Sequence, residues 1–118
     1  MSYIAHYPPA EPPRCQVDNW QGLAVLEFGT PWCPLCQAAQ PALRAALQDC
    51  PGIRHVKVED GKGKPLGRSF GVKLWPTLVL LRDGQNVRQL TRPSAREIEQ
   101  AVQDLADQAE QPETTPET

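Results

Sequence analysis

The sequence has no long apolar run and no excess of basic charge. Its longest apolar stretch falls far short of the ~18 residues that a transmembrane helix needs, so we expect no membrane-spanning segment and no membrane partner. Lysine and arginine number 12 against 14 aspartates and glutamates, which gives a formal net charge of −2. Domains that bind nucleic acids usually carry a large basic excess, and we therefore expect no nucleic-acid partner.

Cysteine is also scarce, with four in 118 residues. That number is too small for a disulfide-stapled scaffold, so the cysteines indicate redox or metal chemistry instead. Residues 1–15 contain neither a Lys/Arg-led apolar run nor a small-residue cleavage site. We therefore expect no secretory signal and a cytoplasmic protein. The apolar content of 40% is sufficient for one small core, and the length predicts a single domain.

The two ends of the chain differ in composition from its middle. Residues 1–18 contain Pro8, Pro9, Pro12 and Pro13, which favour irregular backbone and predict a Pro-rich N-terminal arm. Residues 109–118 are acidic and have almost nothing to bury, so we expect a disordered tail. The folded domain is then predicted to comprise residues 19–108.

Apolar periodicity within that domain predicts four strands and two long helices. The strands are expected at 23–28, 56–58, 77–81 and 87–91. One helix is expected at 33–49, and a second is expected to begin at the capping box formed by Ser94 and Glu97. Residues 60–71 are expected to form a loop or short turns. A right-handed crossover makes the first strand pair parallel, which predicts an α/β fold with a mixed central sheet and helices on both faces.

Cys33-Pro34-Leu35-Cys36 carries the strongest chemical signal in the chain. Two cysteines three positions apart at a helix start face the same side and can close a small disulfide ring. The helix N-terminus offers partial positive charge and free N–H groups, which stabilise a thiolate on Cys33. Because the thiolate is the form that attacks disulfides, Cys33 is the predicted nucleophile, and the deeper Cys36 is the predicted resolving thiol.

Zinc is the alternative chemistry for these cysteines. Four side chains have the types that a tetrahedral zinc site uses: Cys33, Cys36, Cys50 and His55. Cys50 follows Cys36 by fourteen residues, which corresponds to about 20 Å along a helix that rises ~1.5 Å per residue. A helix that presents the CxxC pair therefore keeps Cys50 out of reach, and we expect no metal site.

In order and spacing, the CxxC pair and several other residues resemble the thioredoxin family. The shared pattern consists of Glu27-Phe28, Trp32 directly before Cys33, Pro41 five residues after Cys36, and Trp75-Pro76-Thr77 before an apolar strand. The resemblance covers residues 20–106. It implies a thioredoxin-like fold and a monomeric thiol–disulfide oxidoreductase without a bound cofactor, which exchanges electrons between a reductase and protein disulfide substrates.

The resemblance also implies roles for individual residues. Cys33 attacks the substrate disulfide, and Cys36 resolves the covalent intermediate. The bond between Trp75 and Pro76 is expected to be cis, since a cis peptide costs little only before proline. Trp32, Trp75 and Pro76 then shape the substrate groove, and the backbone of Trp75 pairs with a substrate strand.

Glu27 is a charged residue inside an apolar strand, where it is costly unless paired or protonated. The resemblance implies that it lies buried behind Cys36 and takes the Cys36 proton during resolution. Lys57 in the next strand is a candidate ion-pair partner. Replacement of Glu27 by glutamine is expected to leave stability level or raise it. His6 and His55 are expected to face solvent.

Several positions depart from the common thioredoxin pattern. Pro34-Leu35 replaces Gly-Pro between the cysteines, and Glu27 replaces aspartate. Leu74 and Arg92 stand where thioredoxins commonly have glycines, and Trp75 is bulkier than the usual aliphatic residue. These departures predict a narrower groove and a different choice of partners. They also motivate an alternative function, in which the chain is a thioredoxin-fold binding or chaperone module for one client with little redox turnover.

Overall fold

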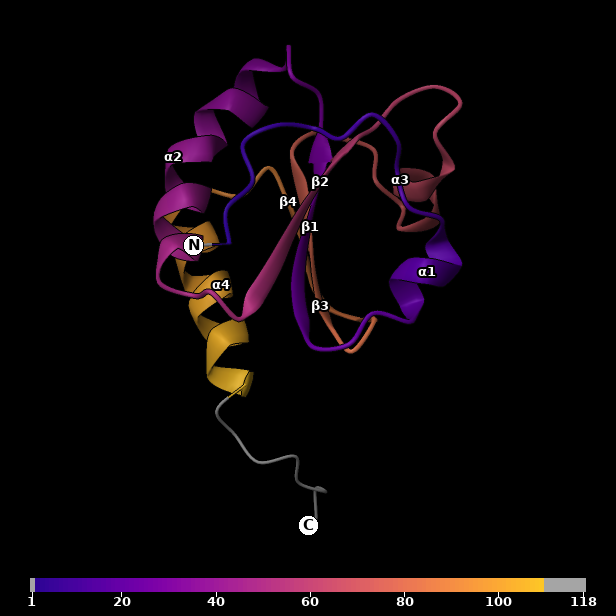
Figure 1. The fold of residues 1–118 in the computed structure, drawn as a ribbon. Helices are drawn as coiled ribbons and strands as arrows, with labels where there is room; N and C mark the ends of the chain where they lie inside the picture. Colours follow the sequence, from indigo (N-terminus) through magenta and orange to yellow (C-terminus); the bar gives the residue numbers. More distant parts are fainter. Residues whose placement is uncertain (1, 110–118) are drawn as a thin grey trace.

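A computed structural model describes residues 2–109 of the chain. Its single sheet has the strand order β2-β1-β3-β4 (Figure 1). The strands are β1 (Leu23–Gly29), β2 (Ile53–Glu59), β3 (Thr77–Arg82) and β4 (Gln85–Thr91). The helices are α1 (Arg14–Asp18), α2 (Pro34–Gln48), α3 (Pro65–Ser69) and α4 (Ala95–Ala109). All four predicted strands and both predicted long helices are therefore present, with ends displaced by a few residues.

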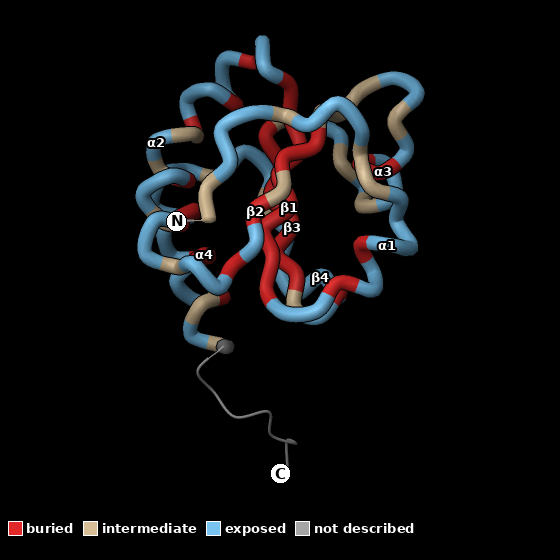
Figure 2. The backbone as a smooth tube through the Cα atoms, viewed as in Figure 1, coloured by how far each residue is buried: buried red, intermediate tan, exposed pale blue. Residues whose placement is uncertain are grey.

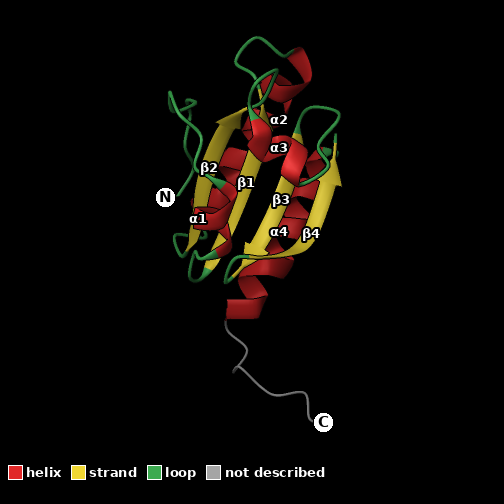
Figure 3. Cartoon of the chain, turned by 90° about the vertical axis from the view of Figure 1, so that its right-hand side faces the viewer, coloured by secondary structure: helices red, strands yellow, loops and turns green. Residues whose placement is uncertain are grey.

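Strand pairing confirms the mixed sheet. β1 pairs in parallel with β2 and antiparallel with β3, and β3 pairs antiparallel with β4. Figure 3 shows α1 and α3 in front of one face of the sheet and α2 and α4 behind the other. The predicted α/β architecture with helices on both faces is thus confirmed. None of the helices among residues 2–109 has the length and apolar character needed to cross a bilayer.

The core consists of two apolar clusters, one on each face of the sheet. Alternate side chains of β1 point to opposite faces, so Leu23 and Val25 pack toward α2 and α4, while Leu26 and Phe28 pack toward α1 and α3. Every residue of β1 is buried, which appears as the red central strand in Figure 2. β1 is therefore a rigid support for the turn and the helix α2 that follow its C-terminal end at Gly29.

Two short helices occur where no helix was expected. α1 forms within residues 1–18, and its Val17 is fully buried in the core. α3 forms within residues 60–71 and begins at Pro65, the first helical position, where the missing N–H of proline costs no hydrogen bond. Arg14 joins the two helices, since its Nη1 donates to the Ser69 carbonyl at 2.8 Å. Residues 14–18 therefore pack as part of the fold, whereas residues 110–118 of the expected tail lie outside the described range.

The capping box at the start of α4 is confirmed. The backbone N–H of Glu97 donates to Ser94 Oγ at 3.1 Å, and a Glu97 carboxylate oxygen accepts the Ser94 N–H at 2.7 Å. The cap fixes where α4 starts, and the apolar face that follows packs against α2 and the sheet. α2 therefore packs against both the sheet and α4, and its N-terminus lies near the C-terminal end of β1.

Candidate redox site

The CxxC pair lies at the N-terminus of α2, and Cys33 is the N-cap residue. Its backbone is extended (φ −80°, ψ 118°), and its sulfur accepts the backbone N–H of Cys36 with 3.2 Å between nitrogen and sulfur. This N–H and the helix dipole both favour negative charge on the Cys33 sulfur. Cys33 is 7% exposed and Cys36 is 1% exposed, so Cys33 is the sulfur that a substrate can reach.

Cys36 needs help to ionise. Burial, the hydrogen bond with the Cys33 thiol and the charges of Cys33 and Glu27 raise the pKa of the Cys36 thiol to about 12, against a smaller lowering by the Thr30 backbone. At neutral pH the thiolate fraction of such a group is roughly one in 10⁵. Because only the thiolate attacks a disulfide, the deeper cysteine requires a proton acceptor.

A buried polar cluster beneath α2 contains a candidate for the group that accepts the Cys36 proton. Glu27 pairs with Lys57 in the register of β1 and β2, and His55 lies two residues earlier on β2. Side chains two apart on a strand share a face, so all three polar groups lie on the face that α2 covers. His55 is buried here, and the expectation that it faces solvent was wrong.

Glu27 is bonded on both carboxylate oxygens. Its Oε1 lies 2.8 Å from His55 Nε2, and its Oε2 lies 3.1 Å from Lys57 Nζ. Gln40 of α2 also donates to Oε2, at 2.8 Å. The predicted ion pair between Glu27 and Lys57 is therefore confirmed, and two further donors that the sequence analysis did not identify complete it.

The electrostatics of Glu27 favour the carboxylate. Burial alone raises the pKa of the Glu27 carboxyl, but the hydrogen bond from His55, the Lys57 charge and the hydrogen bond from Gln40 outweigh it, so the net pKa is lowered. Glu27 is therefore ionised at neutral pH and has lone pairs that can take a proton.

Gln40 connects Glu27 to the backbone of the resolving cysteine. Its amide nitrogen donates to Glu27 and to the Cys36 carbonyl at 2.7 Å, while its oxygen accepts from Lys57 at 2.8 Å and from the Tyr3 hydroxyl at 2.7 Å. Each hydrogen of the amide group is thus used, which fixes its orientation. The sequence analysis missed Gln40, although its spacing of four residues, one helical turn, from Cys36 is a signal that points to it.

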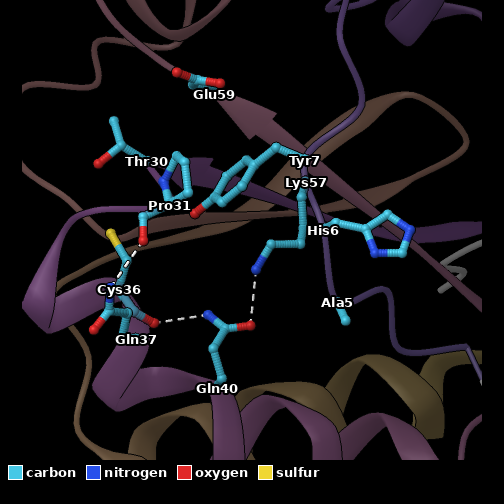
Figure 4. Close-up of a pocket in the computed structure, with 10 residues that line it drawn as sticks. All are labelled: Ala5, His6, Tyr7, Thr30, Pro31, Cys36, Gln37, Gln40, Lys57 and Glu59. Carbon is cyan, nitrogen blue, oxygen red and sulfur yellow. Dashed lines mark hydrogen bonds between the residues drawn. The ribbon is translucent and has the colours of Figure 1, made fainter.

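A cavity of about 350 Å³ opens beside this cluster. Figure 4 shows Cys36, Gln40 and Lys57 on its walls, with Tyr7 of the N-terminal segment beside Lys57. Lys57 and Gln40 contact both the cavity and Glu27. Cys36 therefore adjoins a solvent-connected space whose wall also includes two of the residues that bond Glu27.

The surface around Cys33 is aromatic. Trp32 is 67% exposed and meets Trp75 edge to face, with 5.7 Å between ring centroids. The peptide bond between Trp75 and Pro76 is cis, as predicted. Arg92 lies across this loop, because its Nε donates to the Trp75 carbonyl at 2.9 Å and its backbone N–H donates to the Pro76 carbonyl at 2.8 Å. The arginine thus covers the backbone acceptor expected to pair with substrate.

The zinc interpretation receives no support from the arrangement of its candidate ligands. Within residues 2–109, no three His, Cys, Asp or Glu side chains are grouped so that they could hold a metal ion. Both ring nitrogens of His55 are bonded, one to Glu27 and the other to the backbone of Ile4.

The CxxC pair, a mixed sheet and a buried carboxylate define the chain as a dithiol–disulfide exchange protein.

Comparison with known proteins gives the same answer. A family model described as Thioredoxin matches residues 14–104. Mitochondrial thioredoxin-3 of Saccharomyces cerevisiae is 30% identical over 81 residues, which are 69% of this chain but only 64% of the yeast protein. The structure of reduced thioredoxin 2 from Pseudomonas aeruginosa is 48% identical with a TM-score of 0.80, covering 90% of this chain and 99% of that chain. The oxidised yeast thioredoxin 3 is 28% identical with a TM-score of 0.66, covering 77% and 85%.

The chain belongs to the thioredoxin family. Thioredoxins are protein disulfide oxidoreductases, and the paired cysteines of this chain stand at the helix start where such chemistry is expected.

Proposed function

We propose that this chain transfers electrons to protein disulfides through Cys33 and Cys36, with Glu27 as the proton acceptor for Cys36. One observation carries the proposal: a shallow sulfur and a deep sulfur share one helix N-terminus, and Gln40 bonds both the backbone carbonyl of the deep cysteine and a carboxylate that has three donors. The two thiols thereby differ in access, and burial raises the pKa of the deeper one, which suits it to the second of two consecutive attack steps.

The reaction proceeds in two exchanges. The Cys33 thiolate attacks one sulfur of a substrate disulfide, which forms a mixed disulfide and releases the other substrate sulfur as a thiolate. The Cys36 thiol then loses its proton and attacks the Cys33 sulfur, which releases the second substrate sulfur and leaves a Cys33–Cys36 disulfide. Two electrons have passed to the substrate, and a reductase restores the dithiol.

Glu27 makes the second exchange feasible at neutral pH. It is ionised, and it adjoins through Lys57 and Gln40 the cavity that Cys36 lines. The cavity has room for several water molecules, each of which occupies about 30 Å³, so the proton has a polar route from sulfur to carboxylate. General-base help of this kind typically contributes 10²–10⁴-fold, roughly, to a rate.

Partners and location follow from the same chemistry. Protein disulfides are the proposed substrates, a dithiol reductase is the proposed electron donor, and the chain is proposed to act as a monomer. A solved structure with a chain 25% identical to this one concerns the thiol-resolving mechanism of a yeast mitochondrial 1-Cys peroxiredoxin through the glutathione and thioredoxin systems. Thiol peroxidases are therefore one substrate class to test. The cytoplasm, where thiols stay reduced, remains the proposed location.

A turnover assay tests the proposed function. With a protein disulfide as substrate and a dithiol as electron donor, we expect Cys33→Ser to abolish reduction, because it removes the reachable sulfur. Cys15→Ser is the matched control, since Cys15 is an exposed free thiol on α1, and its activity should equal that of the wild type. A wild-type protein without turnover that still binds one client would instead support the binding module.

Arg92 is proposed to restrict the choice of substrate. It holds the Trp75 carbonyl and lines an apolar groove of about 230 Å³ with Leu35 and Pro76. Arg92→Gly should raise kcat/KM for a generic protein disulfide about fivefold, because the freed carbonyl gains a substrate hydrogen bond worth about 1 kcal/mol.

Arg92→Ala separates access from backbone strain. Arg92 has φ 49°, a left-handed conformation that glycine adopts readily and alanine does not. If the covered carbonyl is the cause, both variants raise kcat/KM. An increase with glycine alone assigns the effect to the backbone, and unchanged or lower values for both contradict the proposed restriction.

A further inference from the structure

His55 lies between the catalytic carboxylate and the start of the chain. Its Nε2 is 2.8 Å from Glu27 Oε1, and its Nδ1 is 2.8 Å from the backbone nitrogen of Ile4. The imidazole is buried and stacks on the Tyr3 ring, with 5.4 Å between centroids and 25° between planes. Both ring nitrogens therefore face fixed partners.

The Ile4 contact determines where the imidazole carries its proton. A backbone N–H can only donate, so Nδ1 must be the accepting, unprotonated nitrogen. The single proton of the neutral ring then lies on Nε2, where it is donated to Glu27. The opposite tautomer would place a lone pair against the carboxylate and an N–H against the N–H of Ile4.

On the basis of the proposed function, we propose that His55 is a positioning residue for Glu27 and that the backbone N–H of Ile4 holds its imidazole in the donating tautomer. The N-terminal segment (residues 2–7) is then part of the redox site. Through His55 it keeps one carboxylate oxygen of Glu27 bonded and the carboxylate oriented while the Cys36 proton is transferred.

Several contacts anchor the N-terminal segment where this role requires it. Ser2 Oγ donates to the Leu47 carbonyl at 3.3 Å near the end of α2, and Tyr3 bonds Gln40. The Tyr7 ring lies 4.6 Å from Lys57 Nζ. Figure 1 shows the segment, in indigo, crossing from the α2 side of the sheet toward α1. It precedes residues 14–104, which match the family model.

Other titratable groups also act on Glu27 and need to be held constant in any test. They are Lys57 on β2, Cys36 on α2, and Tyr3 and Tyr7 on the N-terminal segment. Unlike these groups, His55 bonds both Glu27 and the backbone of the N-terminal segment. A change confined to the Ile4 N–H therefore tests His55 without altering any charge.

Ile4→Pro removes the backbone N–H, whereas Ile4→Ala keeps it and shortens only a side chain that is 40% exposed. Ring ¹⁵N NMR at pH 7 should show His55 protonated on Nε2 in the wild type and in Ile4→Ala, and a mixture of tautomers in Ile4→Pro. A wild-type His55 protonated on Nδ1 overturns the proposal, as does the same tautomer in both variants.

A second pair of variants keeps the test independent of how well Ile4→Pro folds. His55→Leu removes the donor to Glu27, and His55→Gln keeps an amide N–H at similar reach. The hydrogen bond from His55 lowers the pKa of Glu27, so its loss moves that pKa up. We expect the acid midpoint of the resolving step in His55→Leu to rise by about one to two pH units, with His55→Gln near the wild type. No shift in the leucine variant, or equal shifts in both, contradicts the role.

Failure of this inference and failure of the proposed function are distinguishable. Carboxyl ¹³C and ring ¹⁵N spectra of the reduced protein report on Glu27 and His55 without any substrate. A protein with the expected tautomer but no disulfide turnover refutes the function alone. A protein with normal turnover and His55 protonated on Nδ1 refutes the positioning role alone.

Discussion

Glu27→Gln should slow the resolving step by about 10²-fold and leave the first attack nearly unchanged. The variant cannot take the Cys36 proton, and the pKa of about 12 leaves almost no Cys36 thiolate without help. The first attack uses Cys33, whose sulfur accepts the Cys36 N–H at the helix N-terminus and has no bond to Glu27 in the described structure. Rapid mixing with a chromogenic disulfide separates the two steps as consecutive phases.

Glu59→Gln is the matched control for this experiment. Glu59 lines the same cavity from the end of β2, and the described structure gives it no bond to the Glu27 cluster. Its replacement should leave both phases unchanged. Equal slowing in the two variants would assign the effect to the charge of the cavity as a whole, and unchanged kinetics in Glu27→Gln would remove Glu27 from the mechanism.

Glu27→Gln should also be less stable than the wild type, with a free energy of unfolding lower by about 3 kcal/mol at pH 7. Sequence considerations alone favoured equal or higher stability, but the Lys57 ammonium is 2% exposed and would lose its only described counterion. The folded-state pKa of Glu27 is lowered, so its stabilising contribution is complete above the ordinary value of 4.5 and is lost as the pH falls through the lower folded value. Denaturant unfolding curves should therefore converge for the two proteins in acid, and a variant as stable as the wild type at pH 7 would contradict the ion pair.

The sequence predicted those parts of the fold whose apolar periodicity is long. β1, β3 and the buried faces of α2 and α4 are of this kind, and each was correctly placed. α1 and α3 have five residues each, which is too short for a periodic signal. Their positions depend on long-range contacts such as that of Arg14 with Ser69.

The candidate site was also predicted only in part. The CxxC pair, Glu27 and Lys57 follow from local motifs and strand register. His55 was misplaced because it lies on the edge strand β2, where the N-terminal segment, fifty residues distant in sequence, contacts it through the Ile4 N–H and the Tyr3 ring. Nothing in the local pattern of either segment indicates that contact.

Removal of the resolving sulfur should stop the reaction at its covalent stage. Cys36→Ser retains the reachable Cys33 but cannot release the substrate, so disulfide-linked partners should accumulate. Of the CxxC pair, Cys33→Ser retains only Cys36, which is 1% exposed and whose pKa is raised by burial, so this sulfur should trap few partners. The difference between the two variants should be at least tenfold in trapped protein, about the ratio expected from a 1.4 kcal/mol difference in access and ionisation.

Trapping tests the central claim most directly, because the two cysteines are assigned different roles. Each variant is mixed with an oxidised protein disulfide, and the products are resolved by non-reducing electrophoresis and mapped by mass spectrometry. The expected result is a mixed disulfide joined through Cys33 in Cys36→Ser and almost none in Cys33→Ser. Equal trapping by both variants, or by neither, would contradict the assignment of Cys33 as the attacking sulfur and Cys36 as the resolving one.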